Sequence, residues 1–224
     1  MSRALAYCAF CHREGIALPA SGVAAATVRV ITTGELRLLW SEVEWPFAAE
    51  RLQKNALEFH EVISHVFRQT AVIPFRLLSV FADERALAAF AAGHAETFLR
   101  DLERLKDCVQ MECVVYPAPG RAAADKSSGA AYLRGKAEVL QAQEQHVSSI
   151  REGLGPVARD IRVREGKNGT RIFVLMERGK EKEFRTAVEQ VAVPDSLARR
   201  ISGPWPAAEF LSEQVRTPQV ASAG

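Results

Sequence analysis

The stretch ARDIRVREGKNGTRIFVLME, residues 158–177, decides how the second half of this chain folds. In its first part apolar and charged residues alternate, so that Ile161 and Val163 are predicted to face inward and the neighbouring arginines outward. Residues 166–169, Gly-Lys-Asn-Gly, provide the glycine and asparagine that a tight hairpin turn requires. Thr170–Glu177 is almost entirely apolar, which is typical of a central strand. The stretch therefore predicts a β-hairpin whose second strand lies inside a sheet.

Elements on either side of this hairpin complete one regular unit. An alternating strand over Cys108–Tyr116 and a helix over Ala130–Gly153 precede it, and a helix over Glu181–Val191 and a strand over Ala198–Ser202 follow it. The order β-α-β-β-α-β is the ferredoxin-like plan. We expect this unit to form a C-terminal domain over residues 107–211, followed by a flexible tail over 212–224.

The first half of the chain predicts a different order, β-β-β-α-β-α. Its predicted strands and helices are Leu5–Phe10, Val23–Ile31, Leu36–Val43, Phe47–Gln69, Val72–Phe75 and Asp83–Asp107. Both predicted helices carry an apolar stripe at three- and four-residue spacings. We therefore expect residues 1–106 to form an N-terminal domain in which a small mixed sheet packs with two long helices. The fold class is α+β, with two domains.

Composition predicts a globular, soluble protein without a nucleic-acid or membrane partner. Hydrophobic residues make up 48% of the chain and charged residues 25%, with a net charge of only +2. That net charge is too small to indicate nucleic-acid binding, and no run approaches the roughly 18–20 apolar residues of a membrane span. The start, Met1-Ser2-Arg3-Ala4, lacks the apolar region of an export signal, so we expect a cytoplasmic location.

The cysteines do not predict a cofactor or a metal site. Cys8-Ala9-Phe10-Cys11-His12 has the spelling of a haem attachment motif, but a strand there would direct Cys8 and Cys11 to opposite faces. Cys108 and Cys113 also differ in strand parity, so a site made of all four is not expected. We expect four reduced thiols that act as small hydrophobic side chains.

Catalytic motifs are missing, so the sequence does not predict an enzyme. There is no G-x-S-x-G, phosphate-binding loop or G-x-G-x-x-G pattern. His60-Glu61 begins an H-E-x-x-H pattern, but Ser64 stands where the second histidine would be needed. We expect His60 to have a structural role beside Phe59, hydrogen-bonded to a neighbour.

A basic cluster on the predicted hairpin suggests an alternative function. Its members are Arg159, Arg162, Arg164, Lys167, Arg171, Arg178, Lys180, Lys182 and Arg185. A ferredoxin-like sheet with such a cluster could be an RNA- or regulator-binding module. RNA-binding sheets also need stacking aromatics, and the strand offers only Phe173. Acidic residues are interleaved with the cations, which favours a solvated, ion-paired face over an RNA site.

Gly203-Pro204-Trp205-Pro206 forms a rigid segment near the end of the chain. Its two prolines lack backbone donors, so the segment is neither a helix interior nor a central strand. A tryptophan held in this way is either a plug that seals the edge of a core or a docking element for another protein. Buried aromatics outnumber binding anchors, so we expect Trp205 to pack between the C-terminal tail and the second domain.

Four motifs occur together in a fixed order: Phe59-His60-Glu61-Val62, Val72-Ile73-Pro74-Phe75-Arg76, Gly129-Ala130-Ala131-Tyr132-Leu133-Arg134-Gly135-Lys136 and Gly203-Pro204-Trp205-Pro206. In these motifs the sequence resembles the GvpL/GvpF family of gas vesicle proteins, over roughly residues 3–211. The resemblance marks His60, Glu61, Tyr132 and the four residues Gly203, Pro204, Trp205 and Pro206 as structural motif residues. Leu77-Leu78-Ser79 and Ala207-Ala208-Glu209 depart from the family's usual Phe-Gly-Thr and Pro-Tyr-Ser, so the chain looks like a divergent member.

The resemblance implies a two-domain α+β protein with a ferredoxin-like C-terminal domain. It also implies a non-enzymatic accessory or structural protein without a cofactor, which supports the assembly of gas vesicles, the organelles of buoyancy. Its implied partners are the hydrophobic shell protein and other gas vesicle accessory proteins, and its implied location is the gas vesicle.

We expect the shell protein to bind the first domain at Ile73, Pro74, Phe75, Arg76 and Leu77. The proline bars this short strand from full pairing, so it is predicted to be an edge strand with unpaired donors, which can accept a strand from a partner. Arg76 would guide the partner. The alternative is a buried Arg76 that pairs with a carboxylate such as that of Glu61.

Overall fold

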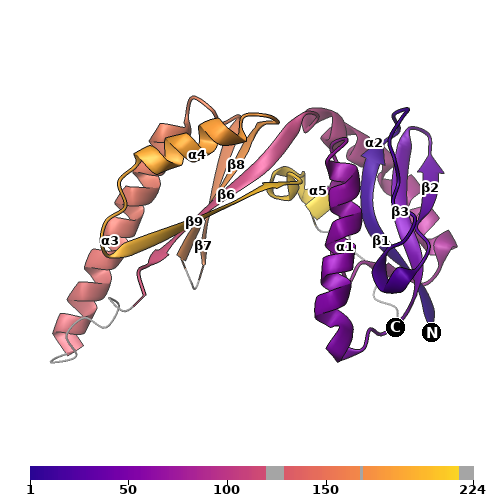
Figure 1. Ribbon diagram of the computed structural model, residues 1–224, viewed down its shortest axis with the longest axis horizontal. Coiled ribbons are helices and arrows are strands. Elements are labelled where there is room, and N and C mark those ends of the chain that lie inside the picture. Colours follow the sequence, from indigo (N-terminus) through magenta and orange to yellow (C-terminus); the bar gives the residue numbers. More distant parts are fainter. Residues whose placement is uncertain (120–128, 167–168, 217–224) are drawn as a thin grey trace. The chain divides into compact units, whose positions relative to one another are not determined.

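The computed structural model describes residues 1–119, 129–166 and 169–216 (Figure 1), except for the side chains of residues 129–132, 214 and 216. The expected turn residues Lys167 and Asn168, and most of the expected flexible tail, lie outside the described residues. The chain divides into two compact units, Met1–Asp107 together with the segment that begins at Pro206, and Cys108–Trp205. It therefore passes from one unit to the other twice, after Asp107 and after Trp205.

Unit 1, the first of these, is built on a five-stranded sheet. Its strands are β1 (Ser2–Cys11), β2 (Arg29–Thr33), β3 (Leu36–Glu44), β4 (Ile73–Pro74) and β5 (Val80–Phe81). Its helices are η1 (Val23–Ala25), η2 (Ala49–Arg51), α1 (Leu52–Phe67), α2 (Glu84–Arg104), η3 (Ala208–Phe210) and α5 (Glu213–Arg216). The strand order is β2-β3-β1-β4. The short strand β5 also pairs with β1, at a different part of that strand from β4.

The sheet of unit 1 is antiparallel in every pairing of the described residues, and the expectation of a mixed sheet was wrong in this respect. The reason is that β4 and β5 run one after the other along the same strand, β1, in the direction opposite to it. Ala4 to Phe10 of β1 are all buried, so both faces of this strand are covered. Tyr7 contacts Phe59 of α1, with ring centroids 5.2 Å apart.

The two long helices of unit 1 were both predicted, and of their starts only that of the first differs. Asp83 caps α2 as expected, because its carboxylate accepts a hydrogen bond of 2.8 Å from Ala86 N. The first helix begins at Leu52 instead of Phe47. The expected strand over Val23–Ile31 is replaced in its first part by η1, where Ala24 and Ala25 have positive φ. The hydroxyl of Tyr7 holds η1 by accepting a hydrogen bond of 3.0 Å from Val23 N.

Unit 2 has the predicted ferredoxin-like fold. Its elements are β6 (Cys108–Pro117), α3 (Gly129–Leu154), β7 (Asp160–Gly166), β8 (Gly169–Glu177), α4 (Glu181–Gln190) and β9 (Leu197–Trp205). The sheet order is β7-β8-β6-β9, antiparallel throughout, and Figure 1 shows α3 and α4 on one side of it. Because β8 is central it is almost fully buried, whereas β7 is an edge strand and Val163 is exposed despite its inward prediction.

The Gly-Pro-Trp part of the rigid segment belongs to β9, an edge strand, in agreement with its exclusion from the sheet interior. Trp205 lies opposite Gln110, where the β6–β9 register shifts. Its side chain is 36% exposed, and its Nε1 donates a hydrogen bond of 3.2 Å to Ser202 Oγ. The expectation of a buried plug was therefore wrong. The side chain stands at the end of an edge strand, which leaves part of it open to solvent.

The segment after Trp205 packs on unit 1, although we expected residues up to 211 to belong to the second domain. Asp101 of α2 is 3% exposed and accepts a hydrogen bond of 2.7 Å from Ser212 N. Arg104 donates a hydrogen bond to the backbone oxygen of Phe210. Phe210 itself is fully buried, at 0% exposure. These contacts explain the difference, since the segment fills a place in the core of unit 1.

The four cysteines differ in accessibility, which predicts an order of reaction. Burial raises the pKa of Cys8 to about 12 and that of Cys113 to about 11, and Cys108 is also buried. Cys11 is half-buried, and its pKa is raised by burial and by Glu35. We expect an alkylating reagent at about pH 8 to modify Cys11 first and the other three only after unfolding. Peptide mass spectrometry measures this order, and early labelling of Cys8 would contradict it.

Candidate partner-binding site

The predicted docking segment lies at the edge of the unit 1 sheet, as its proline suggested. β4 and β5 pair with β1 at Cys8–Ala9 and at Ala4–Leu5, and a turn interrupts the edge between them. Ser79 N donates to the backbone oxygen of Arg76 over 2.8 Å, and Arg76 N donates to Ser79 Oγ over 3.2 Å. Leu77 and Leu78 lie within this turn, between the two short strands in sequence.

The expected unpaired donors are not present in β4. Phe75 N donates to the backbone oxygen of Tyr7 over 2.9 Å, so the backbone of residue 75 faces β1. Because strand residues alternate, the backbone of Pro74 faces away from β1, and proline has no N–H to offer there. A partner strand would find an acceptor at this position but no donor. The edge is protected against strand addition, as short or proline-containing edge strands generally are.

The five predicted binding residues divide into a buried and an accessible group. Ile73 and Phe75 are buried, and the Phe75 ring lies 6.1 Å from the rings of Phe90 and Phe98 in α2. Pro74 and Leu77 are half-buried, and Arg76 is exposed. The accessible surface is therefore the turn. Leu78, which the sequence prediction omitted, is its most exposed large apolar residue, at 62%.

The alternative of a buried Arg76 paired with Glu61 was wrong. Both side chains are exposed, and no ion pair joins them within the described residues. His60 is exposed as well, instead of lying in the apolar stripe, and its Nε2 is 3.1 Å from Ser64 Oγ. Tyr132 is in α3, but its side chain lies outside the described residues.

Glu61 lines a cavity of about 570 Å³ between α1 and the loop around η1. Glu58 and His65, from the same side of the helix, also line it. Glu58 accepts a hydrogen bond of 2.8 Å from Ala24 N and so supports the positive φ of that residue. Of the loop residues that line the other wall, Ala25 lies in the predicted strand Val23–Ile31, and the sequence analysis assigned no element or site to the others.

Three members of the basic cluster of unit 2 form ion pairs with nearby carboxylates. Arg162 lies 3.6 Å from Asp160, Arg171 lies 3.5 Å from Glu112, and Lys180 lies 3.3 Å from Glu177. Phe173, the one aromatic of β8, is 5% exposed and does not offer an open ring for stacking. These contacts favour the solvated, ion-paired face over an RNA-binding surface.

No helix in the described part of the chain has the length and hydrophobicity needed to span a membrane.

Comparison with known proteins connects the fold and the motifs. Residues 4–212 match the family model described as gas vesicle synthesis protein GvpL/GvpF. The crystal structure of gas vesicle protein GvpF from Anabaena sp. PCC7120 is similar with a TM-score of 0.77 and 14% identity, over 95% of this chain and 97% of that one. That of GvpF from Microcystis aeruginosa is similar with a TM-score of 0.74 and 14% identity, over 94% and 99%. A comparison with curated protein sequences gave no match.

Proposed function

Because this chain belongs to the GvpL/GvpF family of gas vesicle synthesis proteins, we propose that it is a non-enzymatic accessory protein that binds the hydrophobic shell protein during gas vesicle assembly. A shell subunit that exposes a wide apolar face before assembly is prone to aggregate. A soluble protein that covers part of this face would keep the subunit available. Its place of action would be the cytoplasm and the surface of the growing vesicle, together with other accessory proteins.

The observation that carries the proposal is the exposed turn Arg76–Ser79 at the sheet edge of unit 1. Leu78 is 62% exposed, and Leu77 beside it is half-buried. An exposed leucine next to a cation provides an apolar contact with a charged rim, which is the usual composition of a small binding surface. Since β4 offers no outward donor at Pro74, we propose that the shell protein contacts the side chains of the turn and does not add a strand there.

Replacing Leu78 by aspartate tests this docking site. We expect Leu78→Asp to reduce the amount of shell protein that co-purifies with the full chain by about tenfold, since a charge replaces a central apolar contact. Leu133→Asp is the matched control, because Leu133 in α3 is 65% exposed and belongs to unit 2. Both variants keep the circular dichroism spectrum of the unmodified protein, since both positions are on the surface.

The docking site at the turn and the function in gas vesicle assembly are contradicted by different results. Equal loss of shell protein in Leu78→Asp and Leu133→Asp would place the contact elsewhere. Capture of RNA by the full chain, with no gas vesicle protein, would overturn the function itself and favour the alternative of an RNA-binding module.

A further inference from the structure

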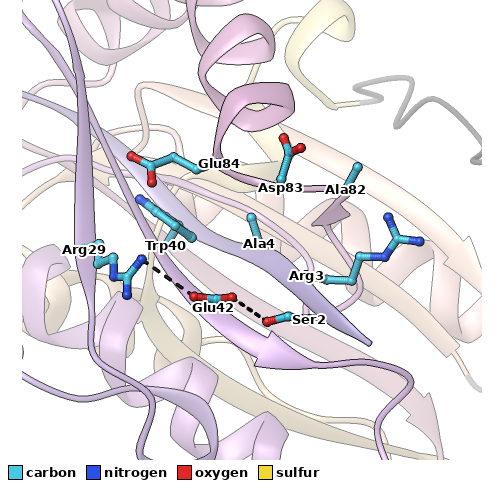
Figure 2. A pocket seen from close by; sticks show the side chains of 9 residues that line it. All are labelled: Ser2, Arg3, Ala4, Arg29, Trp40, Glu42, Ala82, Asp83 and Glu84. Carbon is cyan, nitrogen blue, oxygen red and sulfur yellow. Dashed lines mark hydrogen bonds and ion pairs between the residues drawn. The ribbon is translucent and has the colours of Figure 1, made fainter.

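A cavity of about 230 Å³ lies at the start of β1 in unit 1 and shares no lining residue with the turn proposed to bind the shell protein. Figure 2 shows its lining, which comes from β1, β2, β3 and the segment that leads from β5 into α2. The volume is below the roughly 300 Å³ of a typical small-molecule site. A cavity of this size suits one side chain with its adjoining backbone better than a whole cofactor.

The cavity contains a buried donor that has no partner. Trp40 of β3 is 2% exposed, and its Nε1 forms no hydrogen bond with any described residue. An indole N–H is a donor only, so the missing partner is an acceptor. A buried donor without a partner is unfavourable, which favours a bound group that supplies an oxygen. In Figure 2 the indole nitrogen points toward the side of the cavity where Glu84 lies.

Most charges of the cavity are already engaged. The guanidinium of Arg29 lies over the Trp40 ring, 5.3 Å from its centroid, and 3.7 Å from a carboxylate oxygen of Glu42. The hydroxyl of Ser2 donates to Glu42 over 2.6 Å. Asp83 caps α2 and is not available to a ligand. Glu84 forms no hydrogen bond or ion pair with the described residues.

The remaining charge therefore favours a cation. Three carboxylates and two arginines line the cavity, so its net charge is negative. Figure 2 shows the side chain of Arg3 directed away from Trp40, with Glu42 and Glu84 on either side of the indole. A carboxylate ligand would satisfy the indole N–H but would be repelled by Glu84. A neutral carbonyl would accept a hydrogen bond from Trp40, and a positive group next to it would pair with Glu84.

The backbone amide of Ser2, which lines the cavity, can report on a bound group. Ala6 N donates to the backbone oxygen of Ser79, and Ala4 pairs with Phe81 of β5. Because strand residues alternate, the N–H and C=O of Ser2 point to the same side. β5 ends at Phe81 and the chain turns into α2, so no described strand pairs with Ser2 on that side.

From these observations we infer that the cavity binds a lysine or arginine residue of a partner protein together with its adjoining backbone carbonyl. This carbonyl accepts a hydrogen bond from Trp40 Nε1. The positive side chain pairs with Glu84. The inference does not depend on the shell protein or on the turn at Leu78.

Titration with short peptides tests this inference on the full chain. The probe is acetyl-Val-Lys-Val-amide at millimolar concentration, and the comparison peptide has glutamate in place of lysine. The readouts are the indole N–H signal of Trp40, assigned with Trp40→Phe, and the amide signals around Ser2. We expect the lysine peptide to shift these signals and the glutamate peptide to leave them unchanged.

Two variants separate the roles of Trp40 and Glu84. Glu84→Gln weakens binding of the lysine peptide by about two- to fivefold, as expected for a partly exposed ion pair. Glu183→Gln, which also lies in the first turn of a helix, α4, is the matched control and leaves binding unchanged. Trp40→Phe lowers the melting temperature of the free protein somewhat, because a smaller ring leaves a cavity at this buried position, and abolishes the shift of the Ser2 amide.

Three results would overturn the inference. Equal shifts with both peptides would contradict the charge argument, and no shift with either would mean that the cavity holds only water. Unchanged binding of the lysine peptide by Trp40→Phe would show that the indole N–H does not hold a ligand.

Discussion

Phe210→Ala is expected to destabilise unit 1 by about 3–5 kcal/mol, the cost of truncating a fully buried aromatic side chain. Phe210 is 0% exposed and lies in the short segment that returns to unit 1 after β9. Its neighbour Leu211 is also buried, and the backbone at Ser212 is bonded to Asp101. Loss of the Phe210 ring leaves a cavity and weakens the whole attachment of the segment to α2.

Chemical denaturation measures the loss of stability, and hydrogen exchange measures the protection of the α2 amides. We expect α2 to lose protection near Asp101 and Arg104, whereas β6 and β8 of unit 2 remain protected. Leu133→Ala is the control, because truncation of a side chain that is 65% exposed costs about 0.5 kcal/mol or less. A loss below about 1 kcal/mol in Phe210→Ala would mean that unit 1 does not need the returning segment.

Gly203→Ala is the second change with a large expected effect, about 3 kcal/mol of lost stability in unit 2. Gly203 has a φ of +116°, a backbone conformation that residues with a Cβ rarely adopt. A Cβ at this position would lie 2.8 Å from Met111 Sδ and 2.9 Å from the backbone oxygen of Gln110. The oxygen belongs to the paired strand β6, so the alanine can be accommodated only if the β6–β9 pairing shifts.

Gly179→Ala separates the effect of the positive φ from the effect of a steric clash between the new Cβ and a neighbouring strand. Gly179 also lies in unit 2 and has a φ of +97°, but a Cβ at this position would meet no atom within 4 Å apart from its own chain neighbours. We expect this control to cost about 1–2 kcal/mol, the strain of the backbone alone. If thermal denaturation gave the same loss for both glycines, the close approach of β9 to β6 would not be the cause.

Local patterns in the sequence were sufficient to predict most of the fold. Alternation and the run of apolar residues around Phe173 predicted the ferredoxin-like order of unit 2, because burial in a sheet imposes a period of two residues. Asp83 identified the start of α2, since the cap depends on residues only three apart in the chain. Pro74 identified an edge strand, because a central strand needs the donor that proline lacks.

The rest depends on contacts between residues that are far apart in the chain. The exposure of Trp205 follows from the place of β9 at the sheet edge, and the return of Phe210 to α2 follows from Asp101, more than a hundred residues earlier. The sequence predicts a strand around Trp40, but nothing local shows that its Nε1 lacks a partner. The predicted docking site omits Leu78 because the turn that exposes this residue depends on Ser79.

The two crossings of the chain, after Asp107 and after Trp205, have a consequence for biosynthesis. Unit 2 is continuous in sequence, so all of it has been translated before the last part of unit 1. Domains generally fold as units, the N-terminal one first during synthesis. Here the order is reversed, because unit 1 receives Phe210 only after all of unit 2 has been translated. When translation has just passed Trp205, unit 2 is therefore complete, whereas unit 1 still lacks the segment that contains Phe210.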